Sequence, residues 1–302
     1  MSDVRLFHQM SHLAAAKVIE SYSTSFGAAS RLLAKPVRSR IRDIYAMVRI
    51  ADEIVDGPAA EAGLSTDQIR QVLDQFEADI FATIESGFSP NLVIHAFART
   101  ARDCNLKPEH IRAFFASMRA DITQSVYRGA ELDQYIYGSA AVVGAMCLDV
   151  FISDSKLPGS GEVQEQHVAA LRAGSLRLGA AFQKINFLRD LAEDRTELGR
   201  DYLGVFSEAQ KSAAIQDIRA DLAVAKAAIP GLPRSSRLGV ATAYLLFEAL
   251  TKKLAAVPAA KLQQQRIRIS DFRKVTLVIQ AFFMAQMFKR EMLLSNSAGV
   301  KE

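Results

Sequence analysis

Two pairs of aspartates are the residues of this sequence best suited to chemistry. Asp52 and Asp56 form one pair, and Asp190 and Asp194 form the other. In an α-helix this four-residue spacing places both carboxylates on one face, with Cβ atoms about 5–6 Å apart. Two negative charges at that distance repel each other, and a divalent cation would offset the repulsion. Magnesium suits the role because it accepts carboxylate oxygens and keeps other coordination positions for water and phosphates.

Each aspartate pair has an arginine beside it. Arg49 lies one helical turn before Asp52, and Arg189 directly precedes Asp190 and follows Asn186 by three residues. A planar guanidinium binds phosphate oxygens with two parallel hydrogen bonds. Carboxylates, magnesium and arginines together would hold a diphosphate and stabilise it as it leaves. The residues alone also allow a second interpretation, a buried polar network between helices.

A third aspartate pair shows that the spacing by itself is a weak indicator. Asp217 and Asp221 have the same separation, but their surroundings are typical of the wet face of an amphipathic helix, so we predict a structural role. The other two pairs are surrounded by apolar residues. Around the second pair, polar groups of several kinds also recur at helical offsets, at Gln183, Asn186 and Glu193.

Helices are the elements that we expect to position these residues. Segments of about 15 to 35 residues, rich in good helix formers, lie between breakers such as Gly57-Pro58 and Pro158-Gly159. Within them apolar residues recur at spacings of three and four, as at 111–122, and no convincing strand alternation is present. We predict an all-α protein of about ten helices in one domain spanning residues 1–302.

Composition and charge favour a globular protein with an anionic ligand. Half of the 302 residues are hydrophobic, 23% are charged, the net charge is +4 and the pI is near 9.0. A mild basic excess suits a diphosphate or an anionic membrane surface. Nucleic acid is not an expected partner, because Arg38, Arg40 and Arg42 are the closest approach to a basic run. These three are predicted to form a solvated face or a rim where diphosphates arrive.

Cysteine and histidine usage gives no indication of a zinc or disulfide site. Cys104 and Cys147 lack CxxC spacing, which favours a reduced, cytoplasmic setting, and the 5 histidines lack metal-ligand spacing. The N-terminal residues have no signal-peptide core, and the apolar stretch 140–148 is too short to span a bilayer. We expect a cytoplasmic protein with peripheral contact at the inner face of the membrane, where an apolar substrate would be collected.

The aspartate motifs and their order resemble the squalene/phytoene synthase family. The resemblance runs over about residues 22–277. The segment ADEIVDGP at 51–58 is similar to the first aspartate motif of bacterial and plant phytoene synthases, and NFLRDLAED at 186–194 is the most specific match. Further blocks similar to the family lie at 25–33, 137–144, 199–203 and 268–274.

The resemblance implies an isoprenoid synthase fold, a helical bundle around a deep apolar cavity, and it assigns roles to individual positions. The implied magnesium ligands, with manganese as a substitute ion, are Asp52, Asp56, Asn186, Asp190 and Asp194. The implied catalytic residues are Asp52, Asp56, Tyr137, Arg189, Asp190 and Asp194. The implied substrate-binding residues are Phe26, Arg49, Gln183, Asn186, Arg200, Tyr202, Tyr244 and Arg273.

The implied reaction condenses two geranylgeranyl diphosphates to phytoene, a step of carotenoid biosynthesis. Loss of one diphosphate gives an allylic cation, and the double bond of the second molecule attacks it to form a cyclopropylcarbinyl diphosphate. A second ionisation, rearrangement and proton loss give the hydrocarbon, and no NADPH is expected. Aromatic faces stabilise such cations by about 2 kcal/mol each when desolvated. Phe26, Tyr45, Tyr137 and Phe182 are candidates, with core packing as the equal alternative.

The sequence departs from the family pattern at two positions. Gly204 stands where the family usually has proline, and Tyr22 stands where some relatives have histidine.

Two other functions are alternatives to phytoene synthesis. A squalene or dehydrosqualene synthase using farnesyl diphosphate is the first alternative. A non-catalytic relative acting as an assembly factor is the second, and it would be expected to have lost aspartates that are present here. The sequence makes no prediction of oligomeric state.

Overall fold

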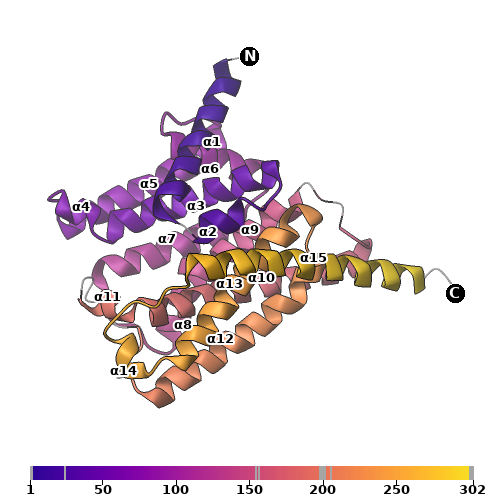
Figure 1. Ribbon diagram of the computed structural model, residues 1–302. Coiled ribbons are helices and arrows are strands. Elements are labelled where there is room, and N and C mark those ends of the chain that lie inside the picture. Colours follow the sequence, from indigo (N-terminus) through magenta and orange to yellow (C-terminus); the bar gives the residue numbers. More distant parts are fainter. Residues whose placement is uncertain are drawn as a thin grey trace.

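The computed structural model describes residues 3–23, 25–153, 155, 157–196, 202–204 and 206–298, without the side chains of residues 25, 26, 194–196, 271, 272 and 287–298. Within these ranges every regular element is a helix, which confirms the predicted all-α class (Figure 1). The helices are α1 (Asp3–Tyr22), α2 (Ser25–Ser30), α3 (Lys35–Val55), α4 (Pro58–Glu61), α5 (Thr66–Ser86), α6 (Leu92–Asp103), α7 (Pro108–Thr123), α8 (Ala130–Ile136), the π-helical turn η1 (Tyr137–Ala141), α9 (Val142–Ser153), α10 (Gly161–Arg189), α11 (Leu191–Thr196), α12 (Glu208–Ala228), the 3-10 turn η2 (Ile229–Gly231), α13 (Arg234–Ala256), α14 (Ala259–Leu262) and α15 (Asp271–Ala298).

The larger hydrophobic core lies among α3, α5, α6, α7 and α9. Leu73, Phe97, Phe114 and Met146 are fully buried in it. Local signals start these helices where the sequence has capping residues. For example, Ser65 and the N3 glutamine of α5 form a reciprocal capping box, which satisfies two backbone N–H groups that a helix start would otherwise leave unpaired.

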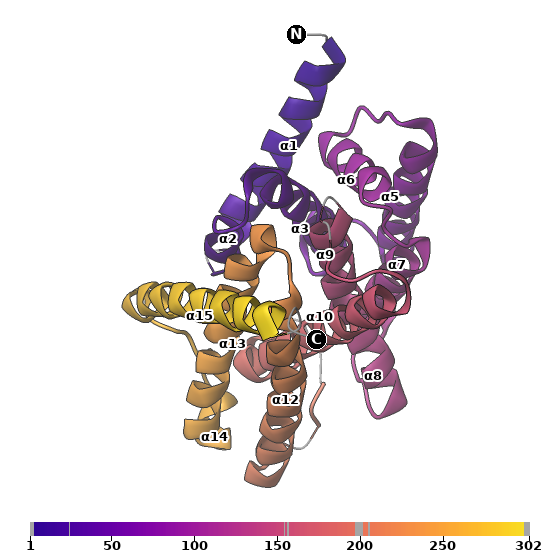
Figure 2. The same ribbon diagram turned by 90° about the vertical axis from the view of Figure 1, so that its right-hand side faces the viewer.

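A second core lies among α10, α12 and α13, where Ile185, Ile218 and Leu254 are buried. Helix α10 packs against α9 and η1 as well as against α12 and α13, so it connects the two cores. Figure 2 shows α10 between the N-terminal helices and the group that includes α12 and α13. The long α10 is therefore the element through which the two halves of the chain hold each other in place.

Close helix packing explains the glycines in the segment 137–144. A Cβ atom on Gly138 would collide with Ser117 and with the backbone of α7, and a Cβ atom on Gly144 would collide with the Ser175 carbonyl of α10. The missing side chains let η1 and α9 approach both neighbours closely. This packing fixes the position of Tyr137, the first residue of η1.

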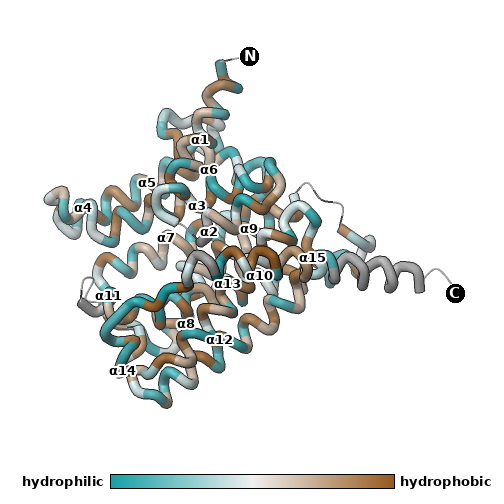
Figure 3. Tube along the Cα trace, in the orientation of Figure 1, coloured by the Kyte–Doolittle hydropathy of each residue, from teal (hydrophilic) through white to brown (hydrophobic). Residues whose placement is uncertain are grey.

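Apolar surface is found on one long helical run and on α15. The run Ala130–Ser153 has 24 residues and is long and apolar enough to cross a membrane by length and composition, but half of its most apolar window is buried. Packing on α7 and α10 accounts for that burial. Helix α15 carries an apolar stretch across the front of the molecule in Figure 3, with Val275, Ile279 and Phe282 exposed.

Candidate active site at the ends of two helices

The first aspartate pair lies at the C-terminal end of α3. Asp52 occupies the last turn, and Asp56 follows the helix as its C-cap, with its backbone N–H donating to the Asp52 carbonyl at 2.8 Å. The C-terminus of a helix carries partial negative charge, so two carboxylates there are unfavourable without a cation. Burial raises the pKa of Asp52 well above its usual range, and Asp56 raises it further, while Arg49 opposes both effects.

Arg49 has an unpaired buried donor among the described residues, its Nε. Its guanidinium forms an ion pair with Glu53 and lies over the Tyr22 ring, 4.6 Å from the ring centre. Within the described part of the chain, its Nε is buried and has no hydrogen-bond partner. An unpaired buried donor is costly, and a phosphate oxygen would satisfy it. The predicted diphosphate contact of Arg49 is therefore chemically reasonable at this position.

The second aspartate pair does not lie on one continuous helix, and the expectation of a single helix face is wrong here. Helix α10 ends at Arg189, and Asp190 is its C-cap, donating its backbone N–H to the Asn186 carbonyl at 2.8 Å. The next helix, α11, carries Asp194. The chain bends at Asp190, between the two helices. The side chain of Asp194 lies outside the described set, so its predicted role stays a prediction.

Asp190 is held by two arginines, and sequence reasoning found only one of them. Arg189 Nε donates to Asp190 Oδ1 at 2.8 Å, and Arg266 Nε lies 2.9 Å from the same oxygen. Arg266 also reaches Glu193 Oε2 at 2.8 Å. It lies in an irregular segment before α15, two residues outside the family-like block 268–274, so only its charge could have suggested a role. The predicted Arg273 instead lies exposed in the first turn of α15.

Asn186 completes the polar groups at the end of α10. Its Oδ1 is buried and has no hydrogen-bond partner in the described part of the chain, and Gln183 lies partly buried one turn earlier. Carboxylates and an amide oxygen are the donors that magnesium prefers. The residues present therefore fit the ion, although no three histidine, cysteine or acidic side chains among the described residues converge on one point. The carboxylate of Asp194 is not among those described.

Asp121 on α7 is a further acidic group that the sequence did not indicate. It accepts hydrogen bonds from Tyr127 Oη at 2.9 Å and Tyr135 Oη at 2.8 Å. It also acts on Asp52, whose pKa its charge raises in addition to the larger effect of burial. Tyr135 Oη in turn lies 3.4 Å from Tyr202 Oη. These hydrogen bonds connect α7 to the segment 202–204 that follows α11.

The predicted tyrosines have different surroundings. Tyr137 is 39% exposed at the start of η1, and such π-helical turns are frequent at functional sites. Tyr202 is buried and stacks on Phe187 with ring centres 4.1 Å apart. Tyr244 is buried in α13 and donates to Glu248 at 3.3 Å. Burial raises the pKa of Tyr244 to about 12, so its phenol is neutral at physiological pH.

Two further predicted substrate contacts fall where the structure gives no side chain. Phe26 lies in α2, but its side chain is outside the described set, and Arg200 lies outside the described residues altogether. Their roles stay predictions. Figure 1 shows α4 and α11, the elements that follow the two aspartate-bearing helix ends, on the left-hand side of the molecule.

The third aspartate pair forms ion pairs with a neighbouring helix, and its surroundings differ from the prediction. Asp221 is only 2% exposed, so the expected wet face is wrong for this residue. Lys184 Nζ on α10 lies 2.6 Å from one oxygen of Asp217 and 2.6 Å from one of Asp221, and Arg177 lies 3.0 Å from Asp221. The two cations of α10 compensate the charge of Asp221, which is buried where α12 packs against α10.

Comparison with known proteins gives one family. Residues 19–205 match the squalene/phytoene synthase family. Phytoene synthase 3, chloroplastic, of Zea mays is 32% identical over 190 residues, which are 62% of this chain and 41% of the relative. The 15-cis-phytoene synthase of Synechocystis sp. is 32% identical over 62% of this chain and 53% of its own length. The presqualene diphosphate synthase of Rhodopseudomonas palustris is 29% identical over 60% and 58%. The chain thus spans about half the length of these curated relatives.

Solved structures show the fold. A dehydrosqualene synthase structure superposes with a TM-score of 0.74 at 20% identity, covering 93% of this chain and 98% of the other. The squalene synthase HpnC from Alicyclobacillus acidocaldarius gives a TM-score of 0.68 at 16% identity, covering 86% and 97%. The predicted isoprenoid synthase fold is confirmed.

Proposed function

The chain belongs to the squalene/phytoene synthase family, and on that premise we propose that it joins two geranylgeranyl diphosphates head to head to give phytoene. The observation that carries the proposal is the acidic pair at the end of α3, where burial and Asp56 raise the pKa of Asp52. The C-terminal end of α10, where Asp190 is the C-cap, also carries the Asn186 Oδ1, which has no hydrogen-bond partner among the described residues. Relatives named phytoene synthase, at 29–32% identity, support the choice of product.

The acidic groups would hold magnesium and the arginines would bind diphosphate. Asp52 and Asp56 would contribute one set of ligands, and Asp190, Asn186 and Asp194 the other. Bound magnesium would neutralise diphosphate oxygens and so promote the departure of the leaving group. The Arg49 Nε, which has no partner in the described part of the chain, would donate to a phosphate oxygen.

Ion pairs around Asp190 suggest an exchange of partners when substrate binds. Arg189 and Arg266 now neutralise the carboxylate that would serve as a metal ligand. A metal at Asp190 would weaken those ion pairs, and the two guanidiniums would then be available to the incoming diphosphate. The same arginines would thus neutralise Asp190 before substrate binds and would bind the diphosphate leaving group afterwards.

The carbocations formed after ionisation need surroundings without a strong nucleophile. Burial raises the pKa of Tyr45, which lies two turns before Asp52 on α3 and stays a neutral phenol at physiological pH. Phe182 on α10 packs on Phe247 of α13 with ring centres 3.5 Å apart. Neutral aromatic faces stabilise a cation without trapping it, so such side chains suit the proposed chemistry.

A second candidate function uses farnesyl diphosphate to make presqualene diphosphate, squalene or dehydrosqualene. The observation in its favour is the 29% identical relative from Rhodopseudomonas palustris, which is named a presqualene diphosphate synthase. Both candidates require the same aspartates and arginines. They differ in the length of the prenyl chain and in the need for a reductant.

The deciding experiment supplies purified protein with magnesium and either farnesyl or geranylgeranyl diphosphate, with and without NADPH, followed by analysis of extracted products. Phytoene from the twenty-carbon substrate, independent of NADPH, is the expected result. A product from the fifteen-carbon substrate alone would move the function to the second candidate. No product from either would contradict both and favour a non-catalytic assembly role. EDTA should abolish product formation, and added magnesium or manganese should restore it.

A further inference from the structure

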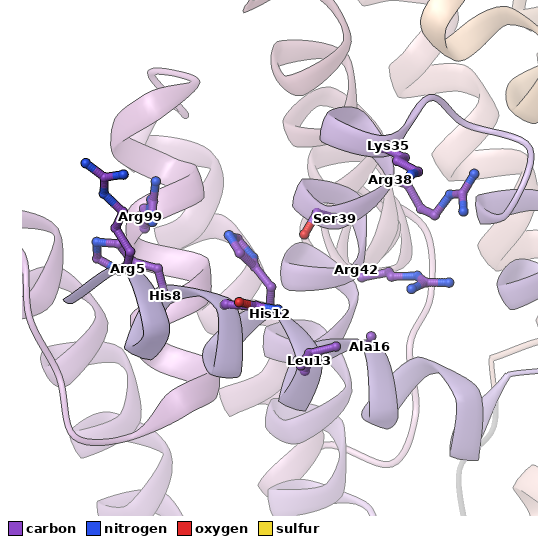
Figure 4. A pocket seen from close by; sticks show the side chains of 11 residues that line it. Arg5, His8, His12, Leu13, Ala16, Lys35, Arg38, Ser39, Arg42 and Arg99 are labelled. Atoms are coloured by element: carbon purple, nitrogen blue, oxygen red, sulfur yellow. The ribbon is translucent and has the colours of Figure 1, made fainter. Parts of the chain in front are cut away.

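The crossing of α1 over α3 and α6 leaves a pocket that the proposed reaction does not use. Small residues from the three helices, Ala15, Ala46 and Ala96, meet at the crossing and let the backbones approach closely. Helix α1 extends beyond that point toward the N-terminus (Figure 1). Next to the crossing a cavity of about 530 Å³ opens between α1, α3 and α6 (Figure 4).

The lining of this pocket is strongly basic. Five arginine and lysine side chains line it, and no aspartate or glutamate is among the lining residues. Figure 4 shows Arg5 and Arg99 toward one end, Lys35 and Arg38 toward the other, and His12 between them. Cations gathered around one concave space repel one another, so they need either solvent or an anion between them.

Two of these five cations already have partners. Arg38 donates through Nε and Nη2 to the Leu33 carbonyl, at 3.2 and 2.9 Å. This contact fixes the guanidinium but leaves its charge uncompensated. Arg99 forms an ion pair with Asp103, at 3.6 Å, on the exposed face of α6. An exposed pair of that length contributes little and can be released at small cost.

The other three cations, Arg5, Lys35 and Arg42, form no ion pair in the described part of the chain. Arg42 Nε is also buried there without a hydrogen-bond partner. Burial lowers the pKa of Arg42, and neighbouring arginines lower it further, against the opposing charge of Glu20. An anion in the pocket would accept the unpaired Nε–H and offset the crowded charges.

The buried carboxylate beside the pocket is already engaged. Asp43 of α3 is fully buried, and its Oδ1 lies 2.9 Å from His12 Nδ1. Its Oδ2 accepts a hydrogen bond from Thr100 Oγ1 at 2.7 Å. These contacts tie α1 and α6 to α3 and form a rigid base for the pocket. The Asp43 carboxylate is thus used in holding the three helices together.

This pocket is separate from the aspartate site. Arg42 precedes Asp52 by ten residues on α3, which corresponds to about 15 Å along the helix axis. Lys35 is farther still, at the N-terminal end of the helix, whereas Asp56 caps its C-terminal end. The two sites therefore lie toward opposite ends of one helix.

We propose that the basic pocket between α1, α3 and α6 binds a phosphate-type anion, either a diphosphate or a phosphomonoester, without a metal ion. Guanidinium groups bind phosphate oxygens directly, so no carboxylates or magnesium are needed. The anion can be free in solution or the headgroup of an anionic phospholipid. An exposed apolar strip along α1, formed by Leu6, Met10 and Leu13, would favour a phospholipid headgroup, because the strip can contact lipid chains. Leu13 also lines the pocket. The proposal is independent of the reaction proposed above.

The first test measures binding of inorganic diphosphate to the full chain by calorimetry in EDTA, which removes any metal-dependent binding at the aspartates. The double variant Arg5→Gln/Lys35→Gln changes two exposed residues, so folding should be preserved. The matched control is Arg219→Gln/Lys226→Gln, which removes the same two residue types from exposed positions on α12. We expect at least about a tenfold loss of affinity in the first variant and less than about a twofold change in the control.

The second test measures co-sedimentation with phosphatidylcholine vesicles that contain or lack phosphatidic acid, using the same three proteins. Binding that requires phosphatidic acid and is lost only in Arg5→Gln/Lys35→Gln would identify a lipid headgroup as the source. Diphosphate binding without vesicle binding would identify a free anion. Absence of both, or equal losses in the pocket variant and its control, would overturn the proposal.

Discussion

Asp52 and Asp56 have the same sequence separation as Asp217 and Asp221, but the two pairs lie in opposite electrostatic surroundings. Asp221 of α12 forms ion pairs with Lys184 and Arg177 of α10. Asp52 has Arg49 as its opposing charge, yet burial and Asp56 together keep its pKa well above the usual range. The chain itself compensates one pair with cations from a neighbouring helix. At the other pair, burial and the neighbouring carboxylate disfavour the charged form of Asp52, and an external cation would favour it.

The position of each pair along its helix reinforces the contrast. Asp217 and Asp221 lie in the interior of α12, whereas Asp56 and Asp190 are the C-caps of α3 and α10. The negative end of the helix dipole disfavours carboxylates at a C-cap and favours a bound cation there. Four-residue spacing is therefore informative only together with the helix end and the partner charges.

The largest expected effect is on catalysis. Asp52→Asn removes a proposed metal ligand, and product formation should fall by about a thousandfold or more, because leaving-group stabilisation by a metal contributes several kcal/mol. Initial rates with the preferred prenyl diphosphate would measure the loss, and circular dichroism would confirm the helical fold. A variant of Asp52 and Asp194 together that kept wild-type turnover would refute the metal assignment.

The next largest effect is on stability at the compensated pair. Asp221→Asn leaves the largely buried Lys184 and the more exposed Arg177 facing a neutral amide, which should lower the free energy of unfolding by about 2 kcal/mol. Urea unfolding at pH 7 would measure the difference. Part of the charge of Lys184 stays compensated by Asp217, at 2.6 Å, which keeps the cost below that of a fully isolated buried cation. An unchanged midpoint would mean that the interface pair contributes nothing.

Sequence reasoning recovered the helical class, the motifs and most of the residues near the two helix ends, because spacing and local chemistry are visible in a single chain. It missed the break at Asp190, which separates Asp194 onto α11. A four-residue spacing looks the same whether a helix continues or ends between the two residues. Whether the chain continues as helix depends on tertiary contacts that the local residues do not encode.

Partners from distant segments were also beyond prediction. Arg266 contacts Asp190 across 76 residues of sequence, and Asp121 acts on Asp52 from another helix. Neither lies in a motif. Burial of Asp221 was missed for the same reason, because the lysine and arginine that draw it inward belong to α10.

A smaller effect, opposite in sign to that at Asp221, is expected for the stability of Asp52→Asn. Burial and Asp56 raise the pKa of Asp52 in the folded protein above its value in the unfolded chain. Stability from this group is thus present at acid pH and is lost as pH rises through the raised pKa. Asparagine cannot ionise, so in EDTA at pH 7–8 the variant should melt at a higher temperature than wild type. The gain should disappear below the unfolded pKa, near about pH 4.

Thermal melts from about pH 3 to about pH 8, with and without magnesium, would test that sign. Magnesium should raise the melting temperature of wild type and leave Asp52→Asn less affected, because the ion offsets the repulsion that the variant lacks. A variant that is destabilised at every pH would show that Asp52 is compensated within the chain, as Asp221 is.

The smallest expected effect is that of Asp217→Asn. The Asp217 side chain is 57% exposed, and its ion pair with Lys184 is backed by the buried Asp221. Exposed ion pairs contribute little, so unfolding free energy should change by less than about 1 kcal/mol and turnover should stay within about twofold of wild type. The same urea and rate assays would measure both quantities beside Asp52→Asn. A large loss of turnover at Asp217, with Asp52→Asn active, would reverse the assignment of the two pairs and place the acidic centre on α12.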